Sequence, residues 1–74
     1  MEITAYTANV LRWTAPGTMV GVLAVTLDDG TSAELILPLP LCLEQANMPA
    51  RYQWLDRVFA RCRHQLDKTS NGGS

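Results

Sequence analysis

Reactive and metal-binding side chains are scarce in this 74-residue sequence, which has one histidine and two cysteines. Cys42 and Cys62 do not form a CxxC pair, and no second ligand stands at a metal-site spacing from His64. A glycine-rich phosphate loop is also missing, and "LDDGTSAE" lacks the alternating oxygen ligands and terminal glutamate of a calcium loop. We therefore expect no catalytic, cofactor-binding or metal-binding site and predict that the protein is not an enzyme.

Long apolar runs are missing as well. The longest candidate, residues 19–27, is far short of the about 20 residues that a membrane-spanning helix needs. The first ten residues lack the cationic start, apolar centre and small-residue cleavage site of a secretory signal. We therefore expect a soluble cytoplasmic protein without membrane contact, whose two cysteines are buried free thiols.

The chain contains enough apolar residues to fold. Hydrophobic residues make up 47% of the sequence and charged residues 18%, and the net charge is −1. A chain of 74 residues forms one domain and buries only about 60% of the surface that it exposes when unfolded. The ending "KTSNGGS" is small and polar. We therefore predict a single domain over residues 1–68 and a disordered tail over residues 69–74.

Three segments have the composition of β-strands. Residues 2–13 are rich in β-branched and aromatic residues, although their alternation is imperfect, and "TAPGT" then supplies a turn. Residues 18–27 are nearly all apolar, and a further strand begins at Ser32. The order predicts a three-stranded antiparallel meander.

The register of the second hairpin follows from side-chain facing. A two-residue loop would place Glu34 among apolar side chains, whereas a three-residue loop over residues 28–30 pairs Leu23 with Leu35 and Val25 with Ala33. The second register, with Gly30 in the left-handed region, is the one we predict. The core face then carries Met19, Leu23, Val25, Leu27, Leu35, Leu37 and Leu39. The other face carries Val20, Val22, Ala24, Thr26, Ser32, Glu34 and Ile36.

Pro38 and Pro40 alternate with leucines in a run that otherwise has the composition of a strand. Each proline removes a backbone donor, so this strand cannot be central over its last residues. We predict an edge strand that leaves the sheet here. A proline-rich recognition peptide would need the longer PxxP spacing.

Residues 47–68 form the predicted helix, with Asn47 as N-cap and Pro49 in the first turn. A stripe at helical spacing should cover the core face of the sheet, and it consists of Met48, Tyr52, Leu55, Phe59, Cys62 and Leu66. A short coiled-coil seam would have the same spacing, but sheet packing is favoured because the core face needs a cover. The fold class is therefore α+β, with a βββα order and one helix on one face of the sheet.

Charge is divided along the chain. Residues 1–46 hold one cation against five carboxylates, and residues 47–74 hold five cations against two carboxylates. Helical geometry gathers Trp54, Arg57, Arg61 and Lys68 on a side away from the apolar stripe. This side is either a solvated basic face or a partner-binding face, since tryptophan and arginine are enriched in binding hot spots.

A single helix covers one face of the sheet, so the other face should expose apolar side chains that a homodimer or a partner protein would cover. The candidate partner-binding residues fall on the helix, the second sheet face and the acidic turn, and they are Trp54, Arg57, Arg61, Val20, Val22, Ile36, Asp28 and Asp29.

The leading hypothesis is a small non-enzymatic protein that sterically blocks a larger nucleic-acid-processing complex. Small single-domain chains without motifs are typical of inhibitors encoded by phages and mobile elements, such as anti-CRISPR proteins, which act in the bacterial cytoplasm. This hypothesis rests on size and type, because no residue pattern matches a particular family. The alternative is a small nucleic-acid-binding regulator or antitoxin that uses the basic helix 47–68, although a pI near 5.6 argues against it. A structural subunit of a larger assembly would use the same surfaces as the inhibitor.

Overall fold

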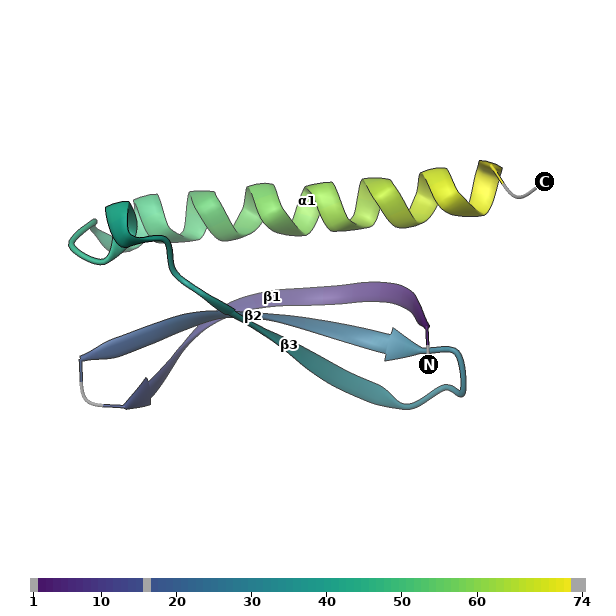
Figure 1. Ribbon diagram of the computed structural model, residues 1–74, viewed down its shortest axis with the longest axis horizontal. Helices are drawn as coiled ribbons and strands as arrows, with labels where there is room; N and C mark the ends of the chain where they lie inside the picture. The colour runs from purple at the N-terminus through teal and green to yellow at the C-terminus, as the bar shows by residue number, and fades with distance from the viewer. Residues whose placement is uncertain (1, 16, 73–74) are drawn as a thin grey trace.

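The computed structural model describes the backbone of residues 2–15 and 17–72, and side chains as far as Lys68. Its strands are β1 (Ile3–Ala15), β2 (Thr18–Leu27) and β3 (Ser32–Pro38), which form one antiparallel sheet in the order β1-β2-β3. A short 3₁₀ turn, η1 (Leu41–Leu43), leads to the helix α1 (Met48–Gly72). The helix lies along one face of the sheet (Figure 1), which confirms the predicted α+β, βββα architecture.

The β2–β3 hairpin has the predicted register. Leu23 lies opposite Leu35 and Val25 opposite Ala33, and the loop is closed by a hydrogen bond from the Gly30 N–H to the Leu27 carbonyl at 2.9 Å. Gly30 has φ of +87°, the left-handed conformation that this loop needs at its last residue. The carboxylate of Asp29 accepts hydrogen bonds from the backbone N–H and hydroxyl of Thr31, at 3.0 and 2.6 Å. These bonds favour the ionised carboxylate and lower the pKa of Asp29.

Strand β1 is less regular than the hairpin beside it. Its pairing with β2 shifts between Ile3 and Ala5, between Tyr6 and Ala8, and between Trp13 and Ala15. Each shift inserts extra backbone into β1 and bends it, which explains why the alternation of this segment is imperfect. Between Ala8 and Trp13 the register is constant, so the middle of β1 is a regular strand.

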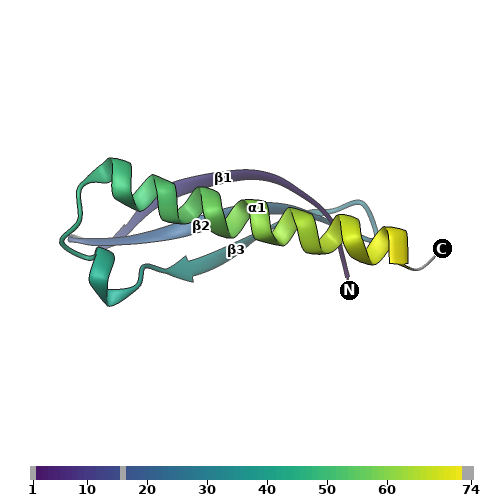
Figure 2. The same cartoon turned by 90° about the horizontal axis from the view of Figure 1, so that it is seen from above.

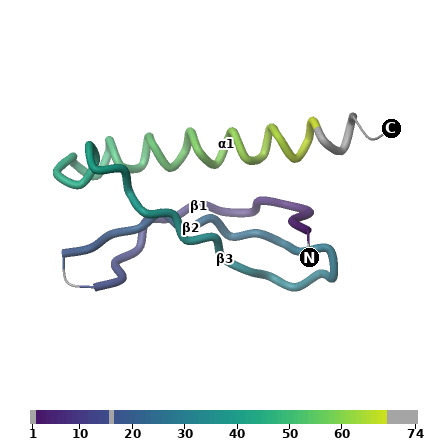
Figure 3. Tube along the Cα trace, in the orientation of Figure 1, coloured from purple at the N-terminus to yellow at the C-terminus, as the bar shows by residue number. Residues whose placement is uncertain are grey.

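Strand β3 lies at the edge of the sheet and ends at Pro38, as the two prolines predicted. Pro40 is already outside the strand, where its carbonyl accepts a 2.8 Å hydrogen bond from the Leu43 N–H at the start of η1. The connection then turns back over the sheet and leads into α1 (Figure 3). Pro38 and Pro40 therefore end β3 and start the turn that positions the helix.

The helix begins as predicted. The side-chain oxygen of Asn47 accepts a 3.0 Å hydrogen bond from the Ala50 N–H, and Pro49 lies in the first turn. Its end differs from the prediction, because α1 continues past Lys68 to Gly72. A helix that has already formed gains one hydrogen bond for each added residue, so a few polar residues can extend it. Of the tail predicted over residues 69–74, only residues 73 and 74 lie outside the described backbone.

The helix packs on the sheet around Leu55 and Gly21, and this contact corrects the predicted stripe. Leu55 is fully buried, and a Cβ built on Gly21 would lie 2.8 Å from Leu55 Cδ1 and 3.0 Å from Trp54 Cζ3. The close approach places Trp54 against β2, whereas Met48 and Tyr52 are each 42% exposed. The buried arc of α1 is thus rotated toward Trp54 relative to the predicted stripe.

Arg51 extends this rotated arc toward the start of the helix. Its guanidinium donates hydrogen bonds to the Leu43 and Glu44 carbonyls, and one N–H lies 3.5 Å from the sulfur of Met19. The arginine therefore joins η1, β2 and α1, and it faces the protein rather than solvent. Among the described residues, no helix is long and apolar enough to cross a membrane.

Candidate protein-interaction surfaces

The sheet face opposite α1 was predicted to expose a broad apolar patch, and the structure corrects this prediction. Val22 is 1% exposed and Val20 is 9% exposed, although no helix covers them. Ile36 is the member of the predicted patch that remains open to solvent, at 52% exposure. Val20 and Val22 cannot contact a partner without a change in this face.

A salt bridge between the two edge strands explains why Val22 is buried. The guanidinium of Arg12 donates two hydrogen bonds to the carboxylate of Glu34, at 2.8 and 2.7 Å. Arg12 lies opposite Val20, and Glu34 lies opposite Ala24 on the other side of β2. A bridge between these positions crosses the central strand at Val22 and covers it.

This bidentate contact shifts the pKa of both groups. Hydrogen bonding to Arg12 lowers the pKa of Glu34, and the same contact raises the pKa of Arg12. Val10 and Ile36 lie on either side of Val22 in the same row of the sheet, and they are 43% and 52% exposed. The face is therefore a narrow apolar row crossed by an ion pair, not an open apolar sheet.

Large exposed apolar residues belong instead to elements that meet one end of the molecule, namely the last part of β1, η1 and the start of α1 (Figure 1). Trp13 is 60% exposed and Leu41 is 84% exposed. Met48 and Tyr52 are the exposed apolar residues of the first helical turns. We call this set, Trp13, Leu41, Met48 and Tyr52, the aromatic end.

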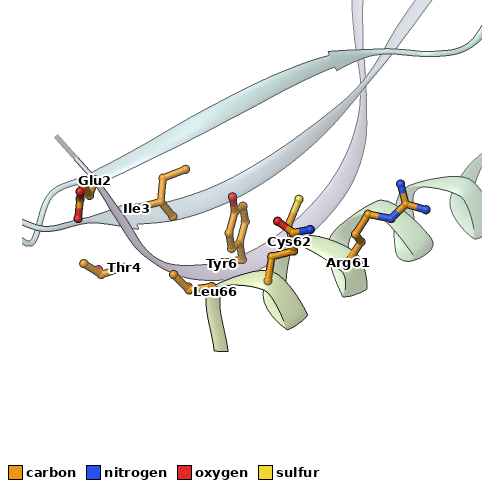
Figure 4. Close-up of a pocket in the computed structure, with 8 residues that line it drawn as sticks. Glu2, Ile3, Thr4, Tyr6, Arg61, Cys62 and Leu66 are labelled. Carbon is orange, nitrogen blue, oxygen red and sulfur yellow. The ribbon is translucent and has the colours of Figure 1, made fainter. Parts of the chain in front are cut away.

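The path of α1 relative to β1 shows how three of these residues relate. Tyr6 lies beside Cys62 (Figure 4), and the Asn9 side-chain amide donates a hydrogen bond to Asp56. The helix therefore runs antiparallel to β1, and one helical turn corresponds to about two strand residues. Continuing this correspondence places Tyr52 at the level of Leu11 on β1, and it places Met48 one turn further on, near the level of Trp13.

The basic side of the helix is only partly as predicted. Arg57, Arg61 and Lys68 are exposed, but Trp54 has turned toward the sheet, so the helix does not combine an exposed tryptophan with arginines. Arg63 packs its guanidinium over the ring of Phe59, with 5.6 Å to the ring centroid. The result is a solvated cationic surface along the second half of α1.

The acidic turn lies at the opposite end of the molecule from the aromatic end. Asp28 and Asp29 are exposed, and the Asp28 N–H donates a 2.9 Å hydrogen bond to the carbonyl of Glu2. Glu2, Asp28 and Asp29 therefore lie near one another beside the start of β1. The residues predicted to bind a partner are distributed over separate surfaces and do not form one site. They are Trp54, Arg57, Arg61, Val20, Val22, Ile36, Asp28 and Asp29.

An open cavity of about 600 Å³ lies between the start of β1 and the second half of α1 (Figure 4). Tyr6 and Cys62 form its inner wall, while the guanidinium of Arg61 points away from them. Partial burial raises the pKa of the Tyr6 hydroxyl, and the nearby Cys62 sulfur adds to this shift. Cys62 is half-buried here, whereas Cys42 is exposed, so the prediction of a buried thiol is wrong for Cys42. No cluster of three metal-ligating side chains is present among the described residues.

Sequence reasoning missed Trp13 and Leu41 as candidate contacts. Trp13 lies two residues before the end of β1, and Leu41 follows Pro40 as the first residue of η1, so each lies near the end of an element. The sequence signal that could have identified them is a large apolar residue close to a turn. No protein-family model, curated protein or solved structure matches this chain.

Proposed function

We propose that the protein is a non-enzymatic interaction module that blocks a larger nucleic-acid-processing assembly by occupying one of its surfaces. The aromatic end carries this proposal, because it exposes Trp13 and Tyr52 where a folded chain could otherwise bury them. Tryptophan and tyrosine are the residue types that contribute most to binding hot spots. Exposed side chains of these types are typical of protein-binding surfaces.

The charge distribution supports a nucleic-acid-processing target rather than an arbitrary one. The exposed carboxylates of Asp28 and Asp29 lie at one end of the molecule, and exposed arginines line α1. An acidic turn can face the basic channel of such an assembly while the aromatic end anchors the contact. The inhibition would then be steric, with no reaction on the target.

A pull-down from bacterial lysate with and without nuclease tests this proposal. We expect a defined protein assembly to remain bound after nuclease treatment and to be lost with the double variant Trp13→Ala/Tyr52→Ala. Ile36→Ala is the matched control, because Ile36 is a similarly exposed apolar residue outside the aromatic end. Equal loss with the control, or loss of all bound protein with nuclease, would contradict the proposal.

The exposed cations of α1 favour a second candidate, a small nucleic-acid-binding regulator. Arg57, Arg61 and Lys68 could contact phosphates, and each contact would make binding more salt-dependent. Binding of labelled duplex DNA and of RNA at increasing salt tests this candidate. A steep loss of affinity with salt, reduced in Arg57→Ala/Arg61→Ala, would favour the regulator over the inhibitor.

A further inference from the structure

We propose that a second copy of this chain pairs antiparallel along the outer edge of β1. The two sheets would then form one six-stranded sheet in the order β3-β2-β1-β1-β2-β3, with both helices on the same face. This inference is independent of the proposed function, because the purified protein alone suffices to test it.

The outer edge of β1 is open, since β1 pairs only with β2 in the described sheet. The helix passes obliquely over the sheet (Figure 2), contacting β2 at Gly21 and β1 near Tyr6, and it covers a face rather than this edge. Between Ala8 and Trp13 the register is free of shifts, so the outward N–H and C=O groups form a regular ladder. A strand in this state is a template for another strand.

The two edge strands differ in the features that usually prevent such pairing. Strand β3 is short and ends in a proline, whereas β1 has 13 residues with neither proline nor lysine. The one charged residue within β1 is Arg12, and its charge is held by Glu34 on the same chain. Two copies of β1 can therefore meet without bringing unpaired like charges together.

Symmetry selects the register. Residues that face each other in an antiparallel pair lie on the same face of the sheet, so the twofold axis must pass midway between a residue and its own copy. An axis at Val10 would place this 43% exposed side chain against its equivalent, and it would place each Arg12 opposite an alanine, Ala8. The pairing thus buries an exposed apolar side chain and separates the two arginines.

The helix also contributes a surface on this side. Because Asp56 bonds to Asn9 on β1, the residues of α1 on the same flank face the β1 edge, and Tyr52 and Phe59 are among them. They belong to the apolar stripe that the sheet leaves partly uncovered, with Tyr52 42% exposed. A second copy, whose helix lies antiparallel across the axis, would cover this part of the stripe.

A stable dimer would need a contact that follows much of this flank. A standard interface buries about 800 Å² on each partner, about a seventh of the 5272 Å² surface of this chain. The molecule is 44 Å long, and β1 and α1 both run along this dimension. A contact along that side involves the strand edge and the helix flank together.

Solution mass tests the proposal with a matched pair of variants, Val10→Lys and Ile36→Lys. Val10 and Ile36 flank Val22 on the same face and are similarly exposed, but they lie on opposite edges of the sheet. From about 1 μM to about 1 mM protein, light scattering should show the wild type reaching twice 8.1 kDa. Val10→Lys should raise the dimer Kd about 100-fold or more through like-charge repulsion, and Ile36→Lys should leave it unchanged.

Each other pattern overturns the proposal. A wild type of 8.1 kDa throughout would show that no dimer forms, and dissociation by both variants would indicate contact through the face that holds Val22. Dissociation by neither variant, or by Ile36→Lys alone, would place the contact elsewhere. Circular dichroism of the variants at low concentration confirms that they remain folded.

Hydrogen exchange of the wild-type protein gives a test that needs no variant. In the dimer, the amides of β1 that point outward become protected along with those already bonded to β2. Alternate amides between Ala8 and Trp13 should therefore exchange faster upon dilution, while those of β3 should not change. Exchange in β1 that is independent of concentration would overturn the proposal.

Discussion

Both faces of β2 hold buried side chains, but different groups cover them. Toward α1, Leu23 and Val25 are buried on the face where Leu55 and Trp54 of the helix approach Gly21. On the opposite face, Val22 is covered by a salt bridge whose partners come from the two edge strands. The comparison shows that a chain with one helix can bury both sides of its central strand when the edge strands carry long side chains of opposite charge.

The two covers should respond differently to substitution and to solution conditions. Apolar burial depends on shape and on the amount of surface removed from water, so it changes little with pH. The salt bridge is half-exposed, so water and salt screen it and it contributes little to stability. We therefore expect the helix side to dominate stability.

The largest effect is expected from Leu55→Ala, because Leu55 is fully buried between α1 and β2. Removing a buried leucine leaves a cavity and costs about 2–5 kcal/mol, a large share of the stability of a small domain. The urea midpoint of unfolding measures the loss. Leu41→Ala removes the same atoms at an 84% exposed position, and an equal loss in this control would contradict the assigned core.

A smaller effect on the same side is expected from Gly21→Ala. The added methyl would lie 2.8 Å from Leu55 Cδ1 and 3.0 Å from a ring carbon of Trp54, so the helix or these side chains must move. Overpacking of this kind costs about 1–3 kcal/mol. In a Leu55→Ala background the clash with the leucine disappears, so the cost should fall, and additive costs would contradict direct contact.

The smallest effect is expected from Glu34→Gln, on the opposite face, and it should depend on pH. The folded-state pKa of Glu34 is lowered, so its stabilising contribution is fully present above the unfolded pKa of about 4.3 and is lost as pH falls through the folded value. The stability difference between wild type and variant should thus shrink in acid. Asp29 also has a lowered pKa, but it is common to both proteins and cancels in the difference. A difference that persists to about pH 2 would contradict this assignment.

The β2–β3 hairpin and the start of the helix could be predicted because local rules decide them. One loop length kept Glu34 off the core face, and Asn47 followed by Pro49 has the composition of a helix start. Each of these features depends on a few neighbouring residues. Their confirmation reflects the strength of side-chain alternation and capping as sequence signals.

The rotation of the helix could not be predicted in the same way. The apolar residues of α1 span a wide arc, and the arc that faces the sheet depends on the space above Gly21, which Leu55 and Trp54 fill. Arg51 lies on the buried side of α1 because it donates hydrogen bonds to backbone carbonyls between β3 and α1. A charged residue in a helix is normally expected to face solvent, so the sequence gives no sign of this position. Both features depend on contacts between distant elements.

The burial of Val22 was hidden for a related reason. The bridge between Arg12 and Glu34 requires the register of β1 against β2, and the three register shifts of β1 break the alternation from which a register is read. Only with the register known do the two charges fall on opposite sides of Val22. The expectation that one helix leaves the second sheet face uncovered therefore overestimates the exposed apolar surface.

The irregular register of β1 should also affect the order in which the elements fold. The β2–β3 hairpin is closed by three residues and needs one constant register, so little chain entropy opposes its formation. Strand β1 must find its place against β2 with extra residues at three points, and α1 can dock only after Gly21 and its neighbours are aligned. We expect folding to begin at the hairpin and end with β1, so the strand with the open edge is also the last to be protected.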